Sequence, residues 1–318
     1  MKQSVLGLIV LFSLLLPSGA LAMHPGVGPG SAKTSGGISM SFHLSVEYLH
    51  GESNEYVYDS ATGQKISQLD WDLKNIVLVG GVFNIYLADH IQMNFGAWTA
   101  ANDGDGQMID RDWNTGNTAW SHWSLSSAML DKGYVFDINL SFPFKFKNGF
   151  ILSPMIGFKF DNWKWSDRGG QYIYSSDGGW RDVIGVFEDE TGIRYEQKYY
   201  APYLGVNLGY TQKKFFVNLY LKGSLWAWSE GKDQHLQRDL EFEDEIDGQS
   251  YVGAGFEAGY VFTEKFYMMA GYDYQRFFET TGDSKIIDLT DNSVGYSLNG
   301  AGTGHHAWAI SLSLGYRF

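Results

Sequence analysis

The sequence predicts an all-β protein, a ten-stranded antiparallel transmembrane β-barrel with long extracellular loops and short periplasmic turns. Apolar and polar residues alternate in segments of about ten residues, as expected for strands with one lipid-facing side and one lumen-facing side. The connections between these segments are short and long in turn. Aromatic residues make up 16% of the 318 residues and glycines number 39, which suits a barrel with aromatic girdles at both membrane interfaces.

The N-terminal residues 1–22 have the features of a secretory signal peptide. A lysine is followed by a short apolar run and by small residues that end at Ala22, so we expect cleavage after Ala22. Residues 23–37 are expected to be a flexible N-terminal leader, and residues 38–318 a single transmembrane β-barrel domain. The chain has no cysteine, so a closed hydrogen-bonded architecture must supply the stability that disulfides give other exported proteins.

Alternation is clearest between Tyr134 and Phe144 and again between Trp308 and Phe318, where every second residue is apolar. A soluble sandwich would also alternate, but its inner face would be dry. Here the second face carries ionisable residues, which a polar barrel lumen accommodates and a dry core does not. Oppositely charged members of this set, such as Lys222 and Glu257, are expected to pair in the lumen. The set comprises Glu47, Lys159, Lys222, Glu257 and Asp273.

Such segments number ten, and the second of them is the least regular. They are residues 38–57, 66–87, 90–100, 133–146, 149–165, 198–212, 215–230, 249–262, 265–278 and 307–318. The short connections are expected on the periplasmic side, and an even strand number places both termini there. The long connections are expected outside the cell and include an acidic run, Asp239 to Asp247, that we interpret as a solvated loop. These long stretches are residues 101–132, 166–197, 231–248 and 279–306.

The charge and the hydrophobic pattern exclude other classes. The formal net charge is −13, which disfavours nucleic acid and favours cationic partners. Beyond the signal peptide, no run of 18 apolar residues occurs, so a helical membrane protein is not expected. We expect a monomer in the bacterial outer membrane.

Two pairs of polar residues in the long connections could carry chemistry. Asp110 and Asp112 form one pair, and Asp233 and His235 form the other. In extended chain, residues i and i+2 point the same way. If the pairs face each other across the barrel mouth, the imidazole could take a proton from a water that the carboxylates position. On spacing alone such pairs are more often solvated rim residues.

The register of the seventh strand conflicts with this arrangement. Strict alternation from Phe215 through Leu225 places odd-numbered residues on the lipid face, and the residues of the second pair are both odd-numbered. Either a β-bulge near Glu230 and Gly231 resets the register, or the chain twists above the membrane. We expect the bulge, because Gly231 permits one.

The chain resembles the omptin family of outer-membrane aspartyl-type endopeptidases over nearly the whole mature length. The most specific stretch is Arg-Gly-Gly at 168–170 followed by Tyr-Ile-Tyr-Ser-Ser at 172–176 and by Ile-Gly at 184–185. The matching stretches occur in the family order with compatible spacing. They are residues 67–71, 110–113, 168–176, 181–185, 202–205, 233–235 and 299–302.

The resemblance implies endopeptidase activity through an activated water. It implies that Asp233 and His235 are the catalytic dyad and that Asp110 and Asp112 are the opposing catalytic pair. It further implies that Glu55 holds a basic side chain before the scissile bond. We therefore expect cleavage of cationic peptides and proteins at arginine or lysine, on the extracellular side of the membrane.

Lipopolysaccharide is the other partner that the resemblance implies, with Lys198 as a lipopolysaccharide-binding residue and lipopolysaccharide needed for activity. Positions on the preceding strand depart from the family pattern, since they hold Phe158, Phe160 and Asn162. A second acid of the family's pocket is replaced by Gly231. An acid that favours a basic residue after the cut is replaced near His122, so selectivity there is expected to be weaker or shifted.

No cofactor and no metal are expected, since the adjacent His305 and His306 have no carboxylate partners nearby in sequence. Two other functions remain open on the same barrel. One is a non-enzymatic surface adhesin whose long loops bind host matrix. The other is a lipid-modifying enzyme, which would need a Ser–His pair on the lipid-facing surface.

Overall fold

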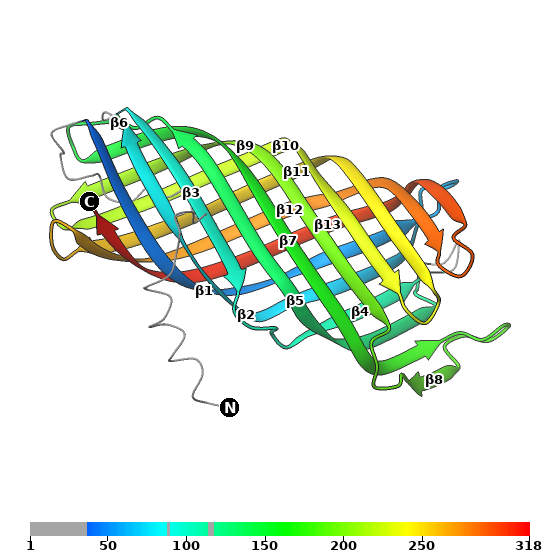
Figure 1. Cartoon of the computed structure of the whole chain (residues 1–318). Helices are drawn as coiled ribbons and strands as arrows, with labels where there is room; N and C mark the ends of the chain where they lie inside the picture. Colours follow the sequence, from blue (N-terminus) through cyan, green and yellow to red (C-terminus); the bar gives the residue numbers. More distant parts are fainter. Residues whose placement is uncertain (1–36, 88–89, 114–117) are drawn as a thin grey trace.

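The computed structural model describes residues 37–87, 90–113 and 118–318, which form one closed antiparallel barrel (Figure 1). The predicted signal peptide lies outside the described residues, as does the predicted leader apart from Gly37. The strands are β1 Ile38–Tyr58, β2 Lys65–Leu87, β3 Ile91–Ala100, β4 Gly106–Asp112, β5 His122–Ser141, β6 Phe144–Lys145, β7 Phe150–Tyr174, β8 Val183–Val186, β9 Ile193–Gln212, β10 Phe215–His235, β11 Leu240–Val261, β12 Phe266–Asp288 and β13 Val294–Arg317.

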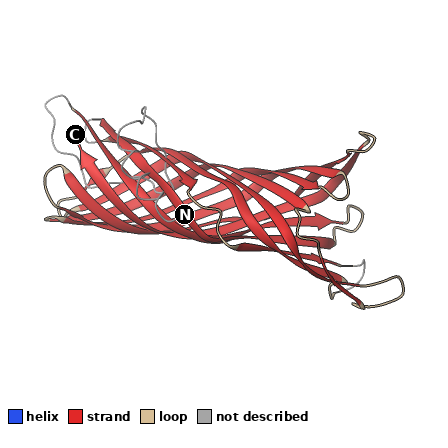
Figure 2. Ribbon diagram, turned by 60° about the horizontal axis from the view of Figure 1, so that its bottom comes forward, coloured by secondary structure: helices blue, strands red, loops and turns tan. Residues whose placement is uncertain are grey.

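Ten strand positions close the ring, and the predicted fold class is confirmed. Strand β1 pairs with both β2 and β13, and β5 pairs with β7, so the described strands leave no long edge open. Strands β3 and β4 occupy one position in succession, because both pair with β2 and β5 at different heights. Strands β6 and β8 are short additions on β7. Figure 2 shows strands and connecting loops throughout the described chain, which contains no helix suited to crossing a membrane.

The strands extend much further than predicted at the end of the barrel opposite the C-terminus. Strand β12 was expected over 265–278 and reaches Asp288, and the expected long loop 231–248 shrinks to a turn of four residues, 236–239, between β10 and β11. The acidic run that we interpreted as a solvated loop lies mostly in β11. The prediction ended these strands too early because apolar alternation marks only the part of a strand that faces lipid. Beyond the bilayer, hydrogen-bonded strands continue with polar residues on the outside.

Alternation sorts side chains between lipid and lumen as the sequence indicates. In β1 and β13, Leu44, Val46, Ile310 and Leu312 are all more than half exposed on the outside. All five charged residues expected on the inner face are nearly inaccessible, at 1–3% exposure. Lys222 Nζ lies 2.7 Å from Asp137 Oδ2, a partner that the sequence pattern did not indicate.

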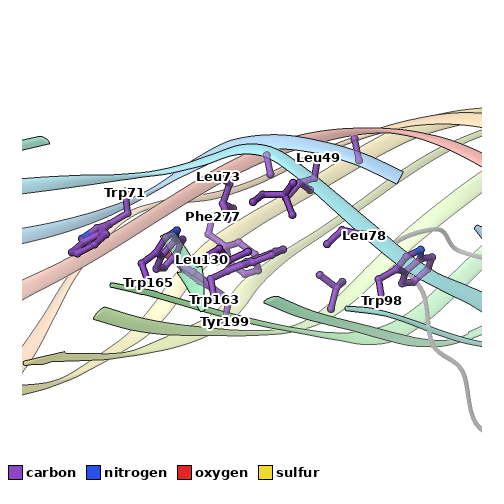
Figure 3. Close-up of a cluster of buried hydrophobic side chains, with 14 of the residues drawn as sticks. Leu49, Trp71, Leu73, Leu78, Trp98, Leu130, Trp163, Trp165, Tyr199 and Phe277 are labelled. Carbon is purple, nitrogen blue, oxygen red and sulfur yellow. The ribbon is translucent and has the colours of Figure 1, made fainter. Parts of the chain in front are cut away.

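Large aromatic and aliphatic side chains fill the lumen between these charged groups (Figure 3). Trp71 of β2 stacks on Tyr195 of β9 with ring centroids 5.5 Å apart, and Trp165 of β7 packs against both rings. All three rings are fully buried. The barrel interior is therefore a packed core, and it supports the side chains at the end of the barrel opposite the C-terminus.

Candidate active site

Strand β10 changes its inward face before it reaches the predicted dyad. Even-numbered residues face the lumen up to Ser224, and odd-numbered residues face it from Ala227 onward. The change occurs at Leu225 and Trp226, which are consecutive and each 68% exposed. Pairing with β11 shifts register between Ser224 and Ser229. This irregularity is a β-bulge, which re-aims every later side chain of the strand.

The expected reset of register is therefore present, but the expected position near Glu230 and Gly231 was wrong. Both residues continue the ladder with β9 and β11 without a shift. A bulge does not require glycine, because its first residue can adopt right-handed helical backbone angles. As a result of the shift, Asp233 is 1% exposed and points inward.

The predicted dyad forms a direct contact at the end of β10. His235 Nε2 lies 2.5 Å from Asp233 Oδ2, with side-chain exposures of 19% and 1%. The carboxylate is thus buried while the imidazole reaches the rim. The ring is held on its other sides by the edge of Phe242, at a centroid distance of 5.4 Å, and by Arg238, whose Nη1 is 3.5 Å from His235 Nδ1.

The opposing acids, Asp110 and Asp112, end strand β4 and share one face. Burial raises the pKa of Asp110 well above its usual value, and the charges of Asp112 and Asp233 raise it further. Burial also raises the pKa of Asp112, against the lowering effect of a Ser67 hydrogen bond and of His122, Arg238 and His235 nearby. These mutual effects place the two pairs within each other's electric field across the barrel mouth.

Glu55 lies on β1 and points into the same acidic interior. Its side chain is 4% exposed, and Oε2 has no hydrogen-bond partner within the described chain. Burial raises the pKa of Glu55 well above its usual value, and the charges of Asp233, Asp244 and Asp110 raise it further, while the Trp71 indole opposes this. A carboxyl in this position is suited to receive a cation from outside the protein.

Sequence reasoning missed Asp244, Arg238 and the contact of His122 with the site. His122 is opposite Asp112 in the β4–β5 ladder, and its ring packs 5.0 Å from that of Tyr174. The i, i+2 rule alone could have found Asp244 as an inward residue, had the acidic run been recognised as a strand. Arg238 lies in the turn after β10, where no sequence pattern fixes its direction.

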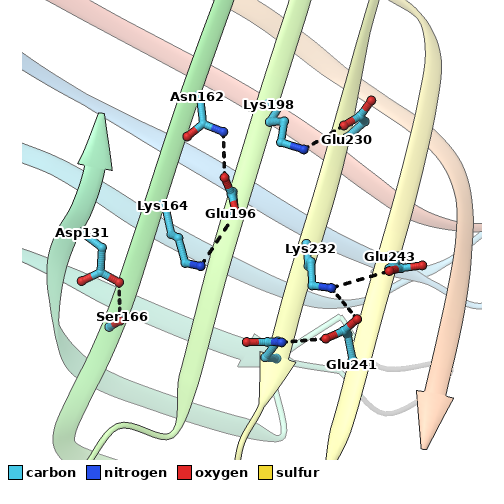
Figure 4. A network of polar contacts seen from close by, with 11 residues as sticks. Asp131, Asn162, Lys164, Ser166, Glu196, Lys198, Glu230, Lys232, Glu241 and Glu243 are labelled. Atoms are coloured by element: carbon cyan, nitrogen blue, oxygen red, sulfur yellow. Dashed lines mark hydrogen bonds and ion pairs between the residues drawn. The ribbon is translucent and has the colours of Figure 1, made fainter. Parts of the chain in front are cut away.

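Lys198 lies on the outer face of β9, among charged and polar side chains of the neighbouring strands (Figure 4). Its Nζ is 3.2 Å from Glu230 Oε2, and Tyr200 Oη also donates to that carboxylate at 3.3 Å. We define the charged belt as Asn162, Lys164, Glu196, Lys198, Glu230, Lys232, Glu241 and Glu243, which are linked in part by ion pairs at 2.5–3.8 Å.

The adjacent histidines of β13 cannot act together. His305 is buried and contacts Ser53 Oγ and Gln275 Nε2, each at 2.9 Å, whereas His306 is exposed on the other face. The described residues contain no group of three side chains suited to holding a metal ion.

Comparison with known proteins shows which family the chain belongs to. The model of the omptin family matches residues 37–318. The chain belongs to the omptin family. This omptin is 30% identical over 288 residues to the outer membrane protease IcsP of Shigella flexneri, covering 88% of this chain and 90% of that protein. It is 28% identical over 326 residues to the plasminogen activator of Yersinia pestis, covering 100% of each.

The fold agrees with this assignment. The crystal structure of outer membrane protease OmpT from Escherichia coli matches with a TM-score of 0.85 at 28% identity, covering 88% of this chain and 97% of that chain. The protein is therefore an outer-membrane β-barrel protease of the omptin family.

Proposed function

We propose that this omptin is an endopeptidase that cuts peptides and proteins at arginine or lysine with a water activated by Asp233 and His235. The observation that carries the proposal is the 2.5 Å contact between a buried carboxylate and an imidazole at the rim. A buried acid fixes the orientation of the ring and stabilises the imidazolium that forms when the ring accepts a proton. The relatives named as outer membrane proteases support a proteolytic function for the chain.

The chemistry follows from which nitrogen faces the acid. With Nε2–H of His235 donating to Asp233, Nδ1 is left as the basic nitrogen once the water takes the place of Arg238 Nη1, which lies 3.5 Å from it. It takes a proton from water, and the hydroxide attacks the carbonyl carbon of the scissile bond. The resulting imidazolium is stabilised by Asp233. The proton that leaves with the departing amine comes from a group on the other wall of the site.

Asp110 and Asp112 are suited to that second role. Two nearby carboxyls share one proton, because each negative charge raises the pKa of its neighbour. The raised pKa of Asp110 favours its protonated form. In our proposal the protonated member donates to the leaving nitrogen as the carbon–nitrogen bond breaks, and the ionised member holds the water by accepting its second hydrogen.

Substrate selection rests on charge. Glu55 takes the basic side chain that precedes the cut, since Oε2 of its buried carboxyl has no hydrogen-bond partner among the described residues. The overall charge of −13 attracts cationic peptides to the mouth. We propose that this mouth faces the extracellular side, because the C-terminus lies at the opposite end of the barrel (Figure 1), and an even number of strands places the termini on the periplasmic side.

Lipopolysaccharide is proposed as a partner of the charged belt. Lysine ammonium groups bind phosphate as point charges, and Lys198 is available if a lipid phosphate displaces Glu230 from their 3.2 Å contact. Activity is expected to depend on lipopolysaccharide through this exchange of partners. No cofactor is part of the proposed mechanism.

The test is hydrolysis of a quenched fluorescent peptide containing Arg-Arg or Arg-Lys, with the full mature chain refolded in detergent plus lipopolysaccharide. His235→Ala is expected to lose at least about a thousandfold in kcat. His306→Ala is the matched control, because that histidine is exposed on the outer face of β13, and it should retain full activity. Unchanged cleavage by His235→Ala would refute the mechanism. A folded parent that cuts no basic peptide would favour the adhesin.

A further inference from the structure

Gly231 leaves space on the inner face of β10, and a side chain of the neighbouring strand β11 lies beside that space. Gly231 lies two residues before Asp233 on the same inward face of β10. Asp244 of β11 is directly opposite it in the ladder. A Cβ atom built on Gly231 would lie 3.1 Å from Asp244 Oδ2 and 3.5 Å from Tyr195 Oη. The Asp244 carboxylate therefore stands beside the volume that a side chain at 231 would enter.

Asp244 is buried, and one of its carboxylate oxygens lacks a hydrogen-bond partner within the described part of the chain. It is 4% exposed, and Oδ1 has no hydrogen-bond partner among the described residues. A hydrogen bond from Ser284 of β12 favours its charged form, but burial and the charge of Asp233 together raise its pKa to about 7. Its neighbours in sequence, Glu243 and Glu245, alternate to the outer side of the strand. The inward direction of Asp244 is thus fixed by the strand itself.

Asp244 and Glu55 are both buried carboxyls near other acids, and among the described residues no cation is a main influence on either of them. The charged groups that act most strongly on Glu55 are the carboxylates of Asp233, Asp244 and Asp110, and the one that acts on Asp244 is Asp233. Within the described chain, no cation is among these main influences, and no metal-binding group of three side chains occurs. Glu55 Oε2 and Asp244 Oδ1 both lack a hydrogen-bond partner among the described residues, and the charge of Asp244 raises the pKa of Glu55. Two such buried acids are costly unless a cation from outside neutralises them.

We infer that Asp244 is the second acid of the pocket for the basic side chain, and that Asp244 and Glu55 bind one arginine guanidinium between them. This inference rests on the proposed specificity for basic residues and adds to it a residue on β11. A guanidinium presents five N–H donors in a planar fork, so it can reach carboxylates on two different strands at once. The Tyr195 hydroxyl beside Gly231 and the Trp71 indole beside Glu55 belong to the same wall.

The first experiment compares two peptides that differ only in arginine or its uncharged isostere citrulline before the cut. In Asp244→Asn, kcat/KM for the arginine peptide is expected to fall about thirtyfold, the effect of losing a charged hydrogen-bond partner. The citrulline peptide should change less than about twofold, since it offers no charge to the lost carboxylate. Glu245→Gln, one residue away on the outer face, is the matched control and should keep the parent ratio.

A relocation experiment uses the geometry at Gly231. Gly231→Asp alone crowds the existing carboxylate, because the new Cβ lies 3.1 Å from it. Combined with Asp244→Ala, the same change puts an acid back into the emptied volume. The double variant should recover the arginine preference to within about threefold of the parent, whereas Asp244→Ala alone should not. Heat modifiability on gels establishes that each variant is folded.

A binding measurement separates failure of this inference from failure of the proposed function. Agmatine, a small guanidinium compound, is titrated calorimetrically into the parent, Asp244→Asn, Glu55→Gln and His235→Ala. Weaker binding in the two acid variants alone supports the pocket, even if the parent cuts no basic peptide and the proposed function falls. Equal arginine preference and equal agmatine binding in Asp244→Asn and the parent would overturn the assignment of Asp244 and leave the endopeptidase in place.

Discussion

Replacing Asp244 with asparagine is expected to stabilise the barrel, and to do so more as the pH rises. The pKa of Asp244 is raised from 3.8 to about 7, mainly by burial, with Asp233 as the nearby charge. At about 1.4 kcal/mol per pKa unit, ionising this carboxyl in the folded protein costs about 4 kcal/mol more than in the unfolded chain. Asparagine keeps the shape of the side chain and removes that cost.

The sign follows from proton binding. The folded state holds the Asp244 proton more tightly than the unfolded state does, so the contribution to stability is fully present below pH 3.8. It is lost as the pH rises and is gone above about 7. The stability difference between Asp244→Asn and the parent should therefore be small at pH 4 and grow to about 4 kcal/mol above pH 7. Glu55 and Tyr195 also face this region, so the variants must be compared at each pH and not across pH values.

The assay is equilibrium unfolding followed by the fluorescence of the 11 tryptophans. Urea is the denaturant, since guanidinium would occupy the proposed pocket. Glu243→Gln supplies a control of opposite sign: a hydrogen bond from Lys285 lowers the pKa of Glu243, so this variant should lose stability near neutral pH and not in acid. That loss should stay under about 1 kcal/mol, because the pair is exposed. A difference for Asp244→Asn that is the same at pH 4 and pH 9 would refute the buried, unpaired acid.

Three other substitutions test the ion pair in the lumen, the preference for the residue after the scissile bond, and the binding of lipopolysaccharide. Lys222→Met removes the cation 2.7 Å from Asp137 and should destabilise the barrel to urea by about 3–5 kcal/mol, most of which Asp137→Asn restores in the double variant. His122→Asp places an acid beside the proposed catalytic aspartates and should raise kcat/KM about tenfold for peptides with lysine after the cut, as read from a peptide library; no change would remove His122 from that subsite. Lys198→Gln should raise the lipopolysaccharide concentration for half-maximal activity about fivefold, and an unchanged requirement would mean that lipid phosphate does not reach this lysine.

The part of the barrel that faces lipid could be predicted from sequence, and the part above it could not. Leu312 and Leu314 alternate with Ser311 and Ser313 because one side of β13 meets lipid and the other the lumen. Higher up, Lys232 faces water on the outside while Asp233 faces the polar site on the inside. Both positions are polar there, so period-two hydrophobicity no longer identifies a strand, although the hydrogen-bonded ladder continues.

The site itself was only partly accessible to such reasoning. The spacing of Asp233 and His235 predicted that both side chains would share a face, and their 2.5 Å contact agrees with that. The position of the bulge was not predictable from glycine, because packing between neighbouring strands decides where an extra residue is tolerated. Two consecutive large apolar residues, Leu225 and Trp226, were the available signal, since regular alternation in a lipid-facing strand would send one of them into the lumen.

The bulge and Asp244 together explain how the proposed pocket for the basic side chain can keep two acids although position 231 is glycine. By shifting the face of β10, the bulge turns position 231 inward, where it would meet Asp244. A side chain at 231 and a carboxylate from 244 compete for one volume, so an acid can be supplied from either strand but not comfortably from both. With glycine at 231, the carboxylate of Asp244 reaches that volume from β11, and its charge raises the pKa of Glu55. In our proposal, the preference for arginine depends on where the carboxylate lies in the pocket and not on which strand carries it. A comparison of β10 alone would find glycine at 231 and miss the carboxylate that Asp244 supplies from β11.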